Sequence, residues 1–133
     1  MKASELRIGN WLQDQYTNVL ELVNADTIHD ISIGSERYQP IPLTEEWLLK
    51  LGFEIHQKHE NGNIFRKEIS YHSGFKVWLD IMNKGGKGEP ILFFILSDNA
   101  GKHFMLPHHY IFLHELQNLW TSLGGEELTI TTE

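Results

Sequence analysis

The chain of 133 residues has 11 basic and 18 acidic side chains and a formal net charge of −7 with neutral histidines. This length predicts a single domain, 1–133, with its own hydrophobic core. The lack of cysteine excludes disulfides, thiolate metal sites and cysteine nucleophiles, and the negative charge without a basic cluster argues against nucleic-acid binding.

The ends and apolar runs of the chain predict a cytoplasmic protein that does not bind membranes. Residues 1–7 have neither the apolar core nor the small-residue cleavage site of a secretion signal. The longest apolar run, Ile91–Leu96, is far too short for a transmembrane helix.

The stretch from residue 5 to residue 43 predicts short β-strands separated by turn signals. Gly9-Asn10 interrupts the first apolar segment, and Asn18–Val23 and Ile28–Ile33 follow as two further strands. Two prolines confine a last strand, Arg37–Leu43, to an edge or an exit. We expect this β-rich subregion, 1–43, to form a small SH3-like barrel portion.

A short helix is predicted to follow. Thr44 is a good N-cap because its hydroxyl can accept a hydrogen bond from a free amide of the first turn. Glu45 and Glu46 lie in that turn, where the helix dipole favours negative charge. Gly52 can adopt the left-handed conformation that ends a helix.

Residues 53–106 predict an antiparallel meander of about four strands. From Phe75 to Met82 every second residue is apolar, and the residues between them are Lys76, Trp78, Asp80 and Met82; this pattern indicates one buried face and one mostly solvent-exposed face. Ile91–Leu96 is apolar at both parities, as in a central strand covered on both sides.

A long helix is predicted from His108 to Leu123, and a final β segment follows near 127–131. An apolar stripe at helical spacing indicates packing on a sheet; it consists of Phe112, Leu116, Leu119 and Leu123. The predicted fold class is therefore α+β: mostly antiparallel sheet, with one short helix and one long C-terminal helix in the part 44–133.

The opposite face of this long helix is the first candidate binding surface. It carries uncharged hydrogen-bonding groups: Tyr110, His114, Gln117, Asn118 and Thr121. Such a face is easier to desolvate than a charged one, which suits a protein partner or self-association. The alternative is a polar face that only meets water or another part of the same chain.

A histidine cluster gives a second candidate. His103, His108 and His109 could contribute to a metal site, since imidazole is a common zinc ligand. The next histidine, His114, follows His109 by five positions, which places it on another side of a helix. Dispersed solvated or capping histidines are the alternative, and we predict no cofactor.

Several segments resemble a family of small Bacteroidetes and prophage-encoded proteins of unknown function. They are Glu5–Trp11, Ile41–Phe53, His114–Trp120 and Gly125–Leu128. The resemblance spans nearly the whole chain and is weakest over 54–108. It implies a bacterial, cytoplasmic or phage-related setting and carries no activity.

The absence of a phosphate-binding loop and of a serine nucleophile motif favours a non-enzymatic function. We expect a protein-binding or accessory protein of phage–host type. Two alternatives stay open: a metal-dependent hydrolase or nucleotide-handling enzyme using the histidine cluster, and a structural subunit of an assembly.

Overall fold

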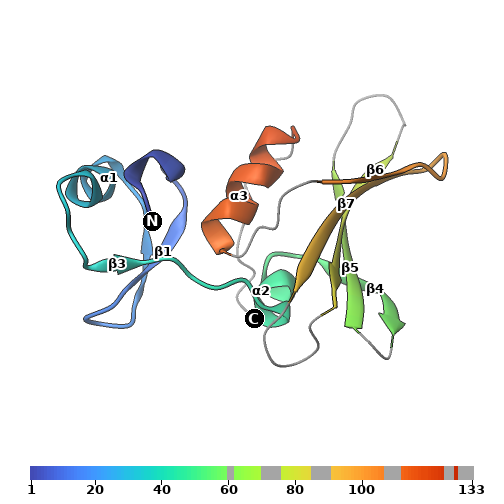
Figure 1. Ribbon diagram of the computed structural model, residues 1–133, viewed down its shortest axis with the longest axis horizontal. Helices are drawn as coiled ribbons and strands as arrows, with labels where there is room; N and C mark the ends of the chain where they lie inside the picture. The colour runs from blue at the N-terminus through green and yellow to red at the C-terminus, as the bar shows by residue number, and fades with distance from the viewer. Residues whose placement is uncertain (60–61, 70–75, 85–90, 107–111, 125–127, 129–133) are drawn as a thin grey trace. The chain divides into compact units, whose positions relative to one another are not determined.

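The computed structural model describes residues 1–59, 62–69, 76–84, 91–106, 112–124 and 128 (Figure 1). The chain is mixed α+β, with two antiparallel sheets and three α-helices in this described part. The elements are η1 (Ala3–Glu5), β1 (Trp11–Asp14), β2 (Leu20–Leu22), α1 (Ala25–Ser32), β3 (Tyr38–Gln39), α2 (Glu45–Lys50), β4 (Glu54–His59), β5 (Gly62–Ile69), β6 (Val77–Asn83), β7 (Leu92–Asp98), β8 (His103–Met105) and α3 (Leu113–Ser122).

The chain divides into two compact units. The first unit is Met1–Leu43 with Ile111–Leu119, and the second is Thr44–Tyr110 with Trp120–Glu133. None of the described helices combines the length and the apolar character that crossing a membrane requires.

The first unit contains a three-stranded antiparallel sheet in the order β2-β1-β3. Leu12 on β1 is fully buried and packs with Leu6 and Val23 in a small core, against which Ile28 and Tyr38 lie. No closed barrel is found in the described residues, so the SH3-like detail stays a prediction.

The predicted strand Ile28–Ile33 is wrong, because these residues belong to α1 and its C-cap. Asn24 caps this helix: its side chain accepts a hydrogen bond from the Thr27 amide at 2.9 Å, and the Thr27 hydroxyl accepts one from the Asn24 amide at 3.3 Å. This reciprocal capping box starts a helix that brings Ile28 and Ile31, three positions apart, to the core.

The predicted start and end of α2 in the second unit are confirmed. The Thr44 hydroxyl accepts a hydrogen bond from the Trp47 amide at 3.3 Å. The chain leaves the helix through Gly52, whose φ of +90° is costly for any residue with a Cβ.

A five-stranded meander, β4-β5-β6-β7-β8, forms the sheet of the second unit. One face is its core, where Phe65, Ile81 and Phe94 oppose one another across three strands and are fully buried. Helix α2 lies on this face, because the Glu45 carboxylate accepts hydrogen bonds from the amide of Asn83 at 2.7 Å and from that of Asn63 on β5.

The last helix is shorter than predicted. Phe112 forms an isolated β-bridge with Pro42, and α3 begins at Leu113 rather than at His108. Within the second unit, the ring of Trp120 at the end of α3 meets Phe53 edge-on, with centroids 5.9 Å apart. The predicted segment 127–131 lies outside the described residues except for Leu128, which is buried.

Candidate functional site

The structure places the predicted helix-face residues in different surroundings. His114 and Gln117 are each only 1% exposed, so the expectation of an exposed, uncharged helix face is wrong for them. Thr121 is half-buried on the last turn of α3, and Tyr110 lies outside the described residues.

Gln117 makes two contacts with the backbone that leads into β1. Its side-chain oxygen accepts a hydrogen bond from the Trp11 amide at 2.9 Å, and its side-chain nitrogen donates to the Gly9 carbonyl at 3.2 Å. The side chain therefore supplies hydrogen-bond partners to two part-buried backbone groups at the start of β1.

Asn118 extends this clamp on the N-terminal segment. Its side-chain oxygen accepts hydrogen bonds from Arg7 Nε and from Asn10 Nδ2, both at 2.9 Å. Its side-chain nitrogen donates to the Glu5 carbonyl at 2.8 Å. We call Gln117 and Asn118 the amide clamp. The clamp gives these two amides of α3 a structural role in the first unit.

His114 lies beside the clamp, and among the residues that the structure describes neither of its ring nitrogens has a hydrogen-bond partner. Its Nε2 is 3.7 Å from Glu5 Oε2, and its ring stacks on Phe112 at an interplanar angle of 10°. Burial lowers the pKa of His114, although the negative charges of Glu115 and Glu5 act in the opposite direction. The side chain is therefore a neutral, buried imidazole at neutral pH.

The histidine cluster is described only in part. His103 is exposed on β8, whereas His108 and His109 lie outside the described residues. Within the described part of the chain, no group of three or more potential ligand side chains is arranged to hold a metal ion.

His103 takes part in a chain of polar contacts across the second sheet. Its Nδ1 is 2.8 Å from the Ser97 hydroxyl oxygen, and the Ser97 hydroxyl donates to Asp80 Oδ2 at 2.7 Å. Because the single hydroxyl proton points to the carboxylate, Nδ1 of His103 must carry the proton that it shares with Ser97. The neutral ring therefore has its lone pair on Nε2.

Arg66 completes this chain on β5. It donates to both oxygens of Asp80, at 2.7 and 3.0 Å, and its guanidinium lies 4.7 Å from the centroid of Trp78. Asp80 raises the pKa of Arg66. The Ser97 hydroxyl is buried and directed at the carboxylate, so it is held as a structural bridge and not presented as a nucleophile.

The strongest candidate binding surface is instead on the hairpin of β1 and β2. We call Leu20 and Leu22, which are 38% and 51% exposed, the β2 patch. Leu20 and Leu22 lie on the sheet face opposite the core, because the intervening Glu21 pairs with the buried Leu12. From the sequence, the apolar residues of this segment predict a strand and do not indicate a binding surface.

The backbone of β2 has an open edge. The Asp14 amide donates to the Val19 carbonyl at 2.9 Å, and the Val23 amide donates to the Asn10 carbonyl at 2.8 Å. In an antiparallel ladder alternate residues face the partner strand, so the amides and carbonyls of Leu20 and Leu22 point away from β1. No described strand pairs with this edge.

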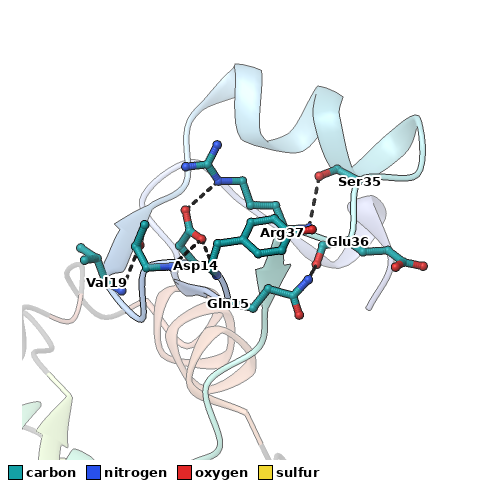
Figure 2. Close-up of polar contacts among 8 residues, drawn as sticks. Asp14, Gln15, Val19, Ser35, Glu36 and Arg37 are labelled. Atoms are coloured by element: carbon teal, nitrogen blue, oxygen red, sulfur yellow. Dashed lines mark hydrogen bonds and ion pairs between the residues drawn. The ribbon is translucent and has the colours of Figure 1, made fainter.

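An ion pair between the buried carboxylate of Asp14 and the half-exposed side chain of Arg37 fixes the turn that precedes β2 (Figure 2). Asp14 Oδ2 accepts a hydrogen bond from Arg37 Nε at 2.6 Å, and Oδ1 accepts from the amides of Tyr16 and Thr17 at 2.9 and 3.3 Å. The bond from Arg37 is the main reason that the pKa of Asp14 is lowered. These contacts hold the turn that leads to Asn18, whose φ is +57°.

Comparison of the chain with protein-family models, with curated proteins and with solved structures finds no match. The resemblance to Bacteroidetes and prophage proteins therefore stays a prediction.

Proposed function

We propose that this protein is a non-enzymatic protein-binding or accessory protein that takes up a strand of a partner protein along β2. The main support for this proposal is that one strand has both two exposed leucines and a backbone edge that faces away from β1. Main-chain hydrogen bonds to such an edge supply affinity, and the alternating side chains supply selectivity.

The contact surface proposed here lies on the hairpin of β1 and β2, and not on the polar face of α3 that the sequence suggests. Gln117 and Asn118 are engaged by the segment 5–11 of the same unit. Leu20 and Leu22 contribute no buried side chain to the core of that unit. Exposed leucines next to an open strand edge are an aggregation hazard unless a partner covers them.

The proposal keeps the bacterial, cytoplasmic and phage–host setting that the resemblance implies. It also treats the first unit as an SH3-like module, for which the β2-β1-β3 sheet is the available support.

Site-specific photo-crosslinking in bacterial cells tests this function. A photoreactive amino acid at position 20 is expected to give one major adduct, and the matched probe at position 33 is expected to give none. Ile33 is the control because it is 70% exposed, lies in the same unit and is outside the β2 patch.

The crosslinked protein is then purified and titrated against the wild type and Leu20→Asp. We expect Leu20→Asp to weaken binding at least tenfold and Ile33→Asp to leave it unchanged. Equal adducts from both positions, or equal affinity of the two variants, would exclude this surface. An adduct with a second copy of the chain would identify an assembly subunit instead.

A further inference from the structure

We infer that the partner segment is an extended strand in which a lysine or arginine stands between two apolar residues. This inference rests on the proposed function and names the chemistry that the β2 edge selects. It follows from the side chains of β2 taken in order, Leu20-Glu21-Leu22.

The apolar positions follow from the pleat of the sheet. Leu20 and Leu22 project from one face of β2, and a strand added at its open edge places every second side chain on that same face. Cross-strand neighbours on one face contact each other directly. Two apolar side chains of the partner, separated by one residue, would therefore cover the two leucines.

The basic position follows from Glu21. Its side chain projects from the other face of β2, because Glu21 pairs with Leu12 of the core face, and it is half-buried. The residue between the two apolar partner residues lies on this same face. A lysine or arginine there faces the Glu21 carboxylate across the new ladder, where opposite charges stabilise a strand pair.

The charge of the whole first unit acts in the same direction. Seven acidic side chains against three basic ones give this unit a formal charge of −4. One of the three cations, Arg37, is bonded to the buried Asp14 carboxylate, and Arg7 bonds to Asn118. The unit therefore attracts a basic segment.

The same charges disfavour a second copy of this chain as the occupant. Two copies paired through β2 would bring two units of charge −4 together. In the antiparallel arrangement centred on Glu21, the two Glu21 side chains would also lie opposite each other, and like charges at directly opposed positions destabilise a strand pair.

Three capped peptides test this inference with the full chain labelled with ¹⁵N. The first is Ser-Thr-Val-Lys-Val-Thr-Ser, the second has Glu in place of Lys, and the third is the first with both valine nitrogens methylated. We expect the first peptide to shift the amide signals of Leu20 and Leu22 and to slow their hydrogen exchange. The second should bind at least tenfold more weakly, and the third should not bind.

A charge exchange makes the test specific. Glu21→Lys is expected to reverse the preference, so that the Glu peptide binds at least tenfold more tightly than the Lys peptide. Added salt should reduce the preference in both proteins, because the opposed side chains are partly exposed.

The two possible failures are distinguishable. Equal binding of the Lys and Glu peptides at Leu20 and Leu22 would overturn the charge selection and leave strand addition at β2 intact. The absence of any response at these two amides, with all peptides, would overturn strand addition itself and with it the proposed function. Binding at another strand edge, such as β8, would have the same consequence.

Discussion

The amide of Trp11 donates a hydrogen bond to the side-chain oxygen of Gln117, 106 residues later in the chain, at 2.9 Å. This bond closes the first unit, because it fixes the start of β1 against α3. A glutamine that sequence reasoning assigns to a solvent-facing surface is thus a structural residue.

Gln117→Leu is expected to destabilise the protein by about 3 kcal/mol, since each of the two backbone groups left without a partner costs about 1–3 kcal/mol. Chemical denaturation followed by circular dichroism measures this loss. Gln39→Leu makes the same chemical change at an exposed position of β3, and it should alter stability by less than about 0.5 kcal/mol. Similar effects of the two variants would contradict the clamp.

Because His114 is buried, we expect the protein to lose stability against unfolding in mild acid. Its pKa in the folded protein is lowered by burial below the ordinary value of 6.5, so the unfolded chain binds the proton more readily. The contribution of the neutral imidazole is present above pH 6.5 and is lost as the pH falls below it, by at most about 1.4 kcal/mol per pH unit. Unfolding free energies between pH 7 and pH 5 measure the slope.

The variants His114→Leu and His29→Leu separate this contribution from those of the other histidines. Removal of His114 should flatten the pH dependence in this range, whereas removal of the exposed His29 of α1 should leave the slope as in the wild type. A wild-type slope in His114→Leu would assign the acid sensitivity to another group.

Because Asp14 is bonded to Arg37, we expect a second loss of stability at lower pH. Its pKa is lowered from 3.8, mainly by the bond from Arg37, so its contribution is present above pH 3.8 and is lost as the pH falls through the folded-state pKa. Asp14→Asn should lower the stability at neutral pH and reduce the further loss below pH 4. Glu36→Gln, at an exposed carboxylate beside Arg37, is the control and should keep the acid transition of the wild type.

The substitution Ser97→Ala is expected to change the tautomer of His103. In the wild type, Ser97 holds the proton of the neutral imidazole on Nδ1; without the hydroxyl, the ring should shift toward the tautomer protonated on Nε2. The ¹⁵N shifts of the two ring nitrogens report this change directly. The exposed His56 of β4 is an internal control and should keep its shifts, and unchanged shifts at His103 would rule out the polar chain.

The sequence predicts local features of this fold well where a short pattern is sufficient. Thr44 and Gly52 delimit α2 because a cap and a left-handed glycine act within a few residues. The alternation over β6 predicts its buried face because the side-chain period of a strand does not depend on its neighbours.

The errors concern residues whose partners are distant or whose periodicity is ambiguous. Ile31 and Ile33 alternate as in a strand, whereas Ile28 and Ile31 have the three-residue spacing of a helix face, and the Asn24 capping box starts the helix. Gln117 and Asn118 are polar residues typical of a solvent-exposed helix face. Only in the folded chain does the segment 5–11 contact them. Leu20 and Leu22 look like core residues until the pairing of Glu21 with Leu12 places them on the sheet face opposite the core.

The first unit is built from two separate segments of the chain, and this constrains the order of folding during synthesis. Its last piece, Ile111–Leu119, is translated only after the whole of Thr44–Tyr110. The five-stranded meander of the second unit, whose strands pair with their neighbours in sequence, therefore leaves the ribosome while the N-terminal hairpin still lacks its closing helix. A nascent chain arrested before residue 111 would expose the backbone of the segment 5–11 to chaperones and proteases.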